Sequence, residues 1–179
     1  MHRALCDAIY NPEYVPFLQK VSALKPAHGH DTRDHKMPLN ECFACGKDNP
    51  DGMHLEFVFD ELNHQAHCHF KLPQRFQGPP GHAHGGIIAT ILDEAMGKVN
   101  KLRHVIALTK SMNVEYLKPV PLKADLHVVG SERKVAGREH HNAAEIRNGK
   151  GEVLARSEGV FIAIDPAQMM AKMKAEGGR

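Results

Sequence analysis

Residues 84–99 read HGGIIATILDEAMGKV and combine two glycines, a long apolar run and two adjacent carboxylates. The apolar residues recur at helical spacing and leave little polar face, which is typical of a helix buried at the centre of a fold. They are Ile87, Ile88, Ile91, Leu92, Ala95, Met96 and Val99. We therefore predict one long central helix over residues 84–99.

On both sides of this helix the apolar period changes to two, which indicates strands. Ahead of it, residues 53–59 and 66–72 alternate around the turn DELN and predict an antiparallel hairpin. After it, four strands are predicted at 105–119, 123–134, 138–147 and 153–165, separated by the turn sequences KPVPLK, VAGR and RNGKG. Because strands and helices do not alternate, we expect an α+β fold in which a curled antiparallel sheet wraps the long central helix.

The two ends of the chain differ from this pattern. Residues 1–38 are predicted to form a helical extension, with Tyr14, Phe17, Leu18 and Val21 on one face, followed by a polar linker. Residues 39–165 would be the compact domain. Residues 166–179 would be a C-terminal helix or tail, because Asp165 and Pro166 suit a helix start.

Composition indicates which kinds of partner and which cellular compartment to expect. The formal charge of the 179 residues is only +2, and the basic residues are scattered, so nucleic acid is not an expected partner. No window has the apolar length of a membrane helix, and the N-terminus lacks the apolar block of a signal peptide, so we expect a cytoplasmic protein without a membrane partner. Four cysteines are too few and too irregular for a secreted disulfide framework.

The two carboxylates of the helix differ in their surroundings. Glu94 has Lys98 four residues on, in the favourable order for an ordinary ion pair on a helix surface. Asp93 has no basic residue within helical reach. Burying a carboxylate on the largely apolar helix is costly unless the carboxylate is hydrogen-bonded, and such carboxylates are frequent at functional sites. The helix face that carries Asp93 is otherwise built of small residues: Gly86, Ala89, Thr90 and Gly97.

The start of the helix offers a second component. The backbone N–H groups of His84, Gly85 and Gly86 lack intrahelical acceptors and lie at the positive end of the helix dipole, where they can polarise a carbonyl oxygen. Gly85 and Asp93 are eight residues apart, or about 12 Å along one helix, which is too far to act on the same carbonyl. If both act on one carbonyl, they must come from different chains of a two-fold dimer.

These residues carry a family resemblance. The segments FQGPPGHA and HGGIIATILDEAMG, together with CFACGKDNPDGMHLEF and MNVEYLKPVP, resemble the hotdog-fold acyl-CoA thioesterases, in the branch that includes the phenylacetate-pathway and mammalian thioesterase-superfamily enzymes. The resemblance covers about residues 39–165. It implies a hotdog fold, a homodimer or tetramer, and hydrolysis of an acyl-CoA substrate to a carboxylic acid and free CoA at the subunit interface, with no cofactor and no metal.

The resemblance also implies roles for individual residues. Asp93 matches the acidic residue that acts as nucleophile or general base, and Gly85 matches the backbone donor to the thioester carbonyl. His84, with Gly86, begins the motif. Thr109 matches a Ser or Thr that holds the attacking water or the carboxylate. Gln77 lies in the loop where many relatives carry Asn and is a candidate for substrate binding.

Coenzyme A needs basic groups near its phosphates. Arg133, Lys134 and Arg138 flank the turn between two predicted strands and are candidates for this contact, although solvated turn charges would also explain them.

Three alternatives stay open. A zinc-binding protein is one, because Cys42 and Cys45 have ligand spacing, and His67 and His69 share a strand face opposite Cys68 that we expect to face solvent. A hotdog hydratase is another, although Asp48 and His54 are six residues apart and lie before the helix. The third is a non-catalytic acyl-CoA-binding protein on the same fold, for which no effector module is evident in residues 1–38.

Overall fold

The computed structural model describes residues 39–165. One helix, α2 (Gly85–Val99), is followed by the short 3-10 helix η2 (Asn100–Arg103), and another 3-10 helix, η1 (Gln74–Phe76), precedes it. The predicted helices in residues 1–38 and 166–179 lie outside the described residues. The strands are β1 (Val58–Asp60), β2 (Gln65–Phe70), β3 (Ile106–Tyr116), β4 (Leu126–Ala136), β5 (Glu139–Asn148) and β6 (Val153–Ile164).

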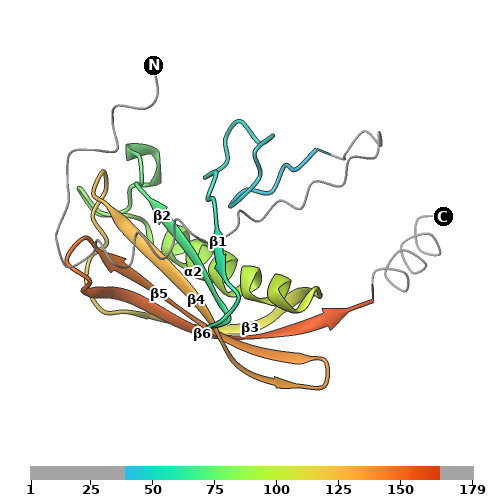
Figure 1. Ribbon diagram of the computed structural model, residues 1–179. Helices are drawn as coiled ribbons and strands as arrows, with labels where there is room; N and C mark the ends of the chain where they lie inside the picture. Colours follow the sequence, from blue (N-terminus) through green and yellow to red (C-terminus); the bar gives the residue numbers. More distant parts are fainter. Residues whose placement is uncertain (1–38, 166–179) are drawn as a thin grey trace.

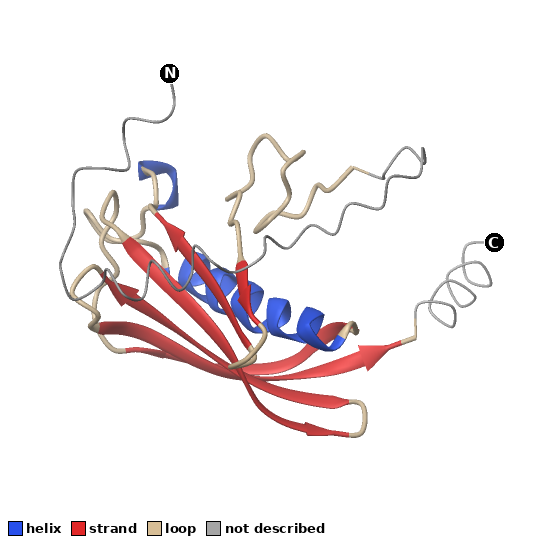
Figure 2. Ribbon diagram, viewed as in Figure 1, coloured by secondary structure: helices blue, strands red, loops and turns tan. Residues whose placement is uncertain are grey.

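All six strands form one antiparallel sheet in the order β1-β2-β4-β5-β6-β3. The sheet curves around α2, which lies against one of its faces (Figures 1 and 2). The predicted helix and the last four predicted strands are therefore confirmed, as is the α+β arrangement of one helix against one antiparallel sheet. Strand β3 pairs only with β6, so it is an open edge of the described sheet.

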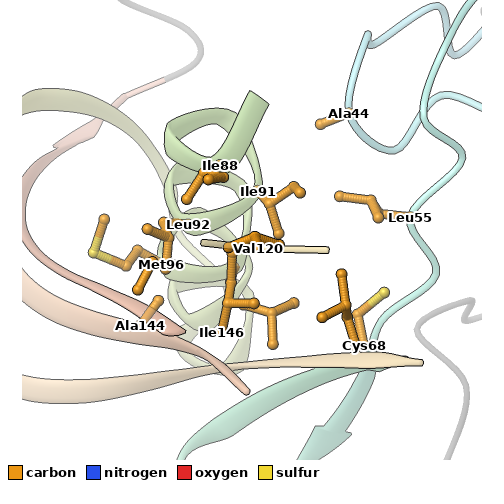
Figure 3. Close-up of a cluster of buried hydrophobic side chains, with 14 of the residues drawn as sticks. Ala44, Leu55, Cys68, Ile88, Ile91, Leu92, Met96, Val120, Ala144 and Ile146 are labelled. Carbon is orange, nitrogen blue, oxygen red and sulfur yellow. The ribbon is translucent and has the colours of Figure 1, made fainter. Parts of the chain in front are cut away.

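Helix α2 forms where the apolar period is 3.6 residues, and it turns that apolar face to the sheet. Its side chains meet inward-facing residues of β2, β4 and β5 (Figure 3). Each fully buried aliphatic side chain contributes roughly 1.5–3 kcal/mol relative to an exposed one. The buried contacts from the helix are Ile88, Ile91, Leu92, Ala95, Met96 and Val99, and those from the sheet include Ala66, Cys68, Val128, Ala144 and Ile146.

Two contacts fix the C-terminal half of α2 on the sheet. A Cβ atom added at Gly130 of β4 would lie 2.2 Å from the carbonyl oxygen of Ala95, so only glycine permits this approach of helix and strand. The buried Asn142 side chain of β5 donates hydrogen bonds of 2.9 Å to Met96 O and to Asn100 Oδ1, where the helix ends. The distance of the helix from the sheet is thus set by β4, and the position where the helix ends is set by β5.

The first predicted strand is mostly wrong. We expected pairing over residues 53–59, but β1 covers only Val58–Asp60. The preceding backbone donors are used elsewhere, because Met53 N–H donates to Phe43 O at 2.8 Å and Leu55 N–H donates to Ala44 O at 2.9 Å. The alternation still determines burial, since Leu55 and Phe57 are both buried in the core.

Within residues 39–165, no helix has both the length and the apolar character needed to cross a membrane.

Candidate active site

Asp93 and Thr109 form the centre of the site. The Thr109 hydroxyl, on β3, donates a 2.8 Å hydrogen bond to Oδ1 of Asp93 on α2. Partial burial raises the pKa of the Asp93 carboxyl, the Thr109 hydrogen bond lowers it, and the neighbouring Glu94 raises it, with burial having the largest effect. The net result is a pKa above the ordinary value for an aspartate. A half-buried carboxylate with a raised pKa and an orienting hydroxyl is suited to act as a base.

The face of α2 that carries Asp93 is only partly covered by the sheet, since Thr109 of β3 reaches the carboxylate. Its small residues are partly or fully exposed, whereas the apolar face is buried. Thr109 is also exposed on the edge strand β3. The stripe consists of Gly86, Ala89, Thr90, Asp93 and Gly97. Because these side chains are short, a second backbone or a slender substrate can come close to the carboxylate.

His84 caps the start of α2. Its backbone is extended, with φ −66° and ψ 141°, and its Nδ1 atom accepts a 3.0 Å hydrogen bond from Gly86 N–H. This cap satisfies one of the donors that a helix start leaves open. A Cβ atom at Gly86 would lie 3.2 Å from that Nδ1 atom, so glycine leaves room for the capping ring. The histidine of the motif therefore has a structural role at this position.

After capping by His84, the backbone N–H group of Gly85 is the donor at the start of α2 that is available to a ligand. Ile87 N–H and Ile88 N–H both donate to His84 O, and Gly86 N–H donates to the His84 ring. No acceptor is found for Gly85 N–H among residues 39–165. Tyr116, at the far end of β3, lies beside this group and donates its hydroxyl to Gly85 O at 3.1 Å. The predicted donor position thus has a free N–H group at the positive end of α2.

Sequence reasoning missed Tyr116 for a physical reason. Thr109 and Tyr116 are seven residues apart, so in a regular strand they would point to opposite faces. A β-bulge between Thr109 and Ser111 changes the alternation, and both side chains therefore reach α2. Nothing in the sequence marks the position of this bulge.

Gln77 lies in the predicted loop, but its side chain closes that loop. Its Oε1 atom accepts hydrogen bonds from Gly81 N–H at 3.0 Å and from Gln74 Nε2 at 2.5 Å. The amide oxygen is therefore used to shape the chain that enters α2. A direct contact with substrate stays a prediction.

Within one chain, the candidate CoA-binding residues Arg133, Lys134 and Arg138 do not lie beside Asp93. Asn142 points to the helix, because its side chain donates to Met96 O. Its neighbour His141 therefore points to the other face of the sheet, and so does Lys134, which is the cross-strand partner of His141. Arg133 and Lys134 line a shallow groove over β3 to β6 with His141 and Glu158. Arg138 donates to Ala163 O at 3.0 Å and holds the end of β6. A contact of these three bases with CoA phosphates stays a prediction.

Glu94 and Lys98 form the predicted ion pair, at 3.0 Å, but the prediction of an ordinary surface pair is wrong. Their side chains are only 19% and 12% exposed, respectively. The reason is the loop of residues 42–46, whose Cys45 Sγ lies 3.0 Å from Lys98 Nζ. Burial, followed by hydrogen bonding to Glu94, raises the pKa of the Cys45 thiol to about 11.

The alternative zinc site made of Cys42, Cys45, His67 and His69 is not assembled. The structure groups Cys42 and Cys45 with Glu94 on the helix side of the sheet. His67 and His69 lie on the other face of β2, because Cys68 between them points into the core. His67 was also expected to face solvent, but it is buried against His127, with 3.2 Å between Nδ1 and Nε2 of the two rings.

Comparison with known sequences identifies related proteins. The family described as Thioesterase superfamily matches residues 80–155. The chain is 27% identical over 135 residues to the acyl-coenzyme A thioesterase THEM4 of Rattus norvegicus, a match covering 75% of this chain and 58% of that protein. The chain thus spans a little more than half the length of this relative.

Comparison with solved structures gives the same fold. The thioesterase superfamily protein RHA08564 superposes with a TM-score of 0.66 at 25% identity, over 84% of this chain and 75% of that one. The protein smu.793 of Streptococcus mutans UA159, solved bound to acetyl CoA, has a TM-score of 0.58 at 20% identity, over 62% of this chain and 88% of that one. These matches confirm the hotdog-like fold that the sequence predicted.

Proposed function

We propose that this hotdog-fold protein, whose residues 80–155 match the Thioesterase superfamily, hydrolyses acyl-CoA thioesters to a carboxylic acid and free CoA. The observation that carries this proposal is the hydrogen bond from Thr109 to the half-buried Asp93 carboxylate on an open face of α2. A thioester carbonyl is electrophilic and its thiolate is a good leaving group. One oriented carboxylate with backbone N–H donors can therefore suffice.

We assign the two chemical tasks to two ends of the helix. Asp93 activates the attack, either by taking a proton from water or by attacking the carbonyl itself. The free Gly85 N–H group, at the positive end of α2, stabilises the oxyanion that develops on the carbonyl oxygen. One such donor lowers the activation barrier by roughly 2.7–4 kcal/mol in acyl-transfer enzymes.

The spacing of these groups supports a site shared by two chains. Asp93 and Gly85 are eight residues apart, about 12 Å along α2, whereas groups acting on one carbonyl lie within a few ångströms of it. Two antiparallel copies of α2 around a two-fold axis would place Asp93 of one chain near Gly85 of the other. The arrangement would give two equivalent sites in each dimer.

The open edge of the sheet supports the same homodimer. Strand β3 is 11 residues long and pairs on one side only. Ile106 and Leu108 on this strand are 56% and 55% exposed. Long apolar edge strands of this kind are normally covered, and pairing with a second copy would satisfy both the backbone and the side chains.

The first experiment measures release of free thiol from a panel of short, long and aromatic acyl-CoAs, with wild type and Asp93→Asn compared. We expect turnover by wild type and a loss of at least a hundredfold in the variant. Coenzyme A binding by a protein that turns over no thioester would favour the alternative of a non-catalytic acyl-CoA-binding protein. Full activity in Asp93→Asn would rule out the assigned role of this residue.

The shared site is tested by mixing two inactive variants. Gly85→Pro removes the N–H group, and the proline ring suits the first turn of a helix after the extended backbone of His84. Gly85→Ala keeps the N–H group and places its Cβ atom 3.7 Å from the Tyr116 ring, so it is the matched control.

Co-refolding Gly85→Pro with Asp93→Asn in equal amounts would make half of the dimers hybrid, each with one intact site of two. About one quarter of wild-type activity should return. A site contained in one chain would give no recovery, provided that wild type refolded in parallel regains its activity.

A further inference from the structure

The loop of residues 42–46 forms a tight turn that presents two thiols. Gly46 N–H donates to Cys42 O at 2.8 Å, and Asp48 closes the base of the loop by accepting a 2.8 Å hydrogen bond from Asn40 N–H. A Cβ atom at Gly46 would lie 2.4 Å from Cys42 O, so only glycine allows the turn. The spacing C-x-x-C-G therefore directs Cys42 and Cys45 to a common side.

The same loop is anchored in the core. Ala44, between the two cysteines, is buried, and it packs with Leu55 and Ile91 in the core on the flank of α2 (Figure 3). Leu55 N–H donates to Ala44 O at 2.9 Å. The position of the thiols relative to the helix is therefore fixed by burial and by backbone hydrogen bonds.

The helix adds a third ligand atom. Cys42 Sγ, Cys45 Sγ and a carboxylate oxygen of Glu94 all lie within 4.8 Å of one another. In a tetrahedral zinc site with Zn–S bonds of about 2.3 Å, neighbouring ligand atoms are separated by about 3.8 Å. Small side-chain rotations would therefore bring these three atoms onto one ion.

The charge of the surroundings matches a divalent ion. Two thiolates and one carboxylate carry three negative charges, and a divalent cation leaves one of them uncompensated. Lys98 Nζ lies 3.0 Å from both Cys45 Sγ and Glu94 Oε1, so its ammonium group supplies the missing positive charge. A cation that donates hydrogen bonds to ligand atoms is a common outer-shell partner of metal sites.

We propose that Cys42, Cys45 and Glu94 bind a zinc ion, with Lys98 as the charge-balancing neighbour and a water molecule as the fourth ligand. Thiolates select zinc over magnesium or calcium, which prefer oxygen ligands. The ion would join the loop of residues 42–46 to α2. It is separate from the proposed thioester site, because adjacent residues Asp93 and Glu94 point about 100° apart on the helix.

The test uses cobalt(II) as a spectroscopic substitute for zinc on the full-length chain, purified without a metal-binding tag, reduced and stripped with a chelator. We expect one cobalt per chain, a thiolate-to-cobalt charge-transfer band in the near ultraviolet, and visible bands of tetrahedral intensity. Zinc should displace the cobalt and raise Tm by several degrees. The charge-transfer band matters because the 14 histidines of the chain can also hold metal without thiolate.

Three variants define the ligands. Cys42→Ser and Cys45→Ser should each lose at least half of the charge-transfer band, because each keeps only one thiolate, and Glu94→Gln should weaken cobalt binding at least tenfold with the band retained. The matched controls are Cys68→Ala, which removes a thiol that is buried in the core and does not belong to the cluster, and Asp93→Asn, which removes the adjacent carboxylate; both should bind as wild type does. Far-ultraviolet circular dichroism confirms that each variant is folded.

Two results would overturn the proposal: a cobalt spectrum unchanged in both cysteine variants, or a Cys42–Cys45 disulfide in freshly purified protein that binds no metal after reduction. None of these readouts uses thioesterase activity. The zinc site and the proposed function can therefore fail independently.

Discussion

The Thr109 hydroxyl donates its hydrogen bond to Asp93 across the boundary between the edge strand β3 and the helix α2. Because the donor and the carboxylate belong to different elements, the protonation of Asp93 depends on how closely β3 lies against α2. Asp93, which accepts this bond, is also the residue whose pKa is raised by burial.

Replacing Thr109 by valine should move the acid limb of the pH profile to higher pH. A general base must be ionised, so kcat/KM falls as pH decreases through the pKa of Asp93. The Thr109 bond lowers this pKa, so its loss raises the pKa further. We expect a roughly tenfold loss of kcat/KM on the acid side, equivalent to about 1.4 kcal/mol. Thr109→Ser keeps the hydroxyl and should restore the wild-type profile; identical profiles for the valine variant and wild type would contradict the assignment.

Asp93→Asn should stabilise the folded protein while abolishing turnover. A carboxyl whose pKa is raised on folding binds protons more tightly in the folded state, so its ionisation opposes folding at pH values above that raised pKa. Removing the charge should therefore increase the free energy of unfolding at neutral pH by about 0.5–2 kcal/mol. At a pH below the ordinary aspartate range the two proteins should unfold alike. Urea denaturation at both pH values is the measurement, and a variant less stable than wild type at neutral pH would argue against a functional carboxylate.

His84→Ala should lower stability through loss of the helix cap. The Nδ1 atom of His84 accepts the Gly86 N–H bond, and loss of an N-cap side chain costs typically about 1 kcal/mol. Asn is a good N-cap, so His84→Asn should recover most of this stability in thermal unfolding. If His84 had a chemical role in addition, His84→Asn would be stable but slow, so the ratio of kcat between His84→Asn and wild type decides this point.

Leu108→Lys should convert the proposed dimer to a monomer. The side chain is 55% exposed on the open edge of the sheet, and a lysine there places a charge where a second copy of β3 would pair. Sedimentation should show half the mass and activity should fall with it. Leu62→Lys is the matched control, because Leu62 is 90% exposed in the turn between β1 and β2. A wild-type mass for Leu108→Lys would place the interface elsewhere.

Much of this architecture follows from periodicity. The 3.6-residue spacing of Ile88, Ile91, Leu92 and Ala95 predicts α2, and the turn sequences with Gly137 and Gly151, both at positive φ, separate the last strands. The helix and the turns are determined by residues that are close together in the chain, so local spacing suffices to predict them. The pairing of Thr109 with Asp93 agrees with what the family resemblance implied.

The remaining features depend on long-range geometry. Tyr116 reaches Gly85 because of a bulge that local sequence does not mark. Glu94 is buried by Cys45, which is 49 positions earlier in the chain, so helical spacing to Lys98 alone suggested a surface pair. The face of the sheet that carries Arg133 and Lys134 depends on strand alternation and on the bulge between Glu132 and Lys134, which local sequence does not mark, so their contact with CoA phosphates stays a prediction.

Gly130 takes no part in the proposed chemistry, but it sets the distance on which that chemistry depends. Any side chain at this position must push Ala95 away from β4, since a Cβ atom there would lie 2.2 Å from the Ala95 carbonyl oxygen. Asp93 is two residues from Ala95 on the same rigid helix, so it would move away from Thr109 as well. The proposed catalysis is therefore constrained by a glycine on the opposite side of the helix from the proposed site, and a side chain there should lower turnover while every assigned reacting group stays intact.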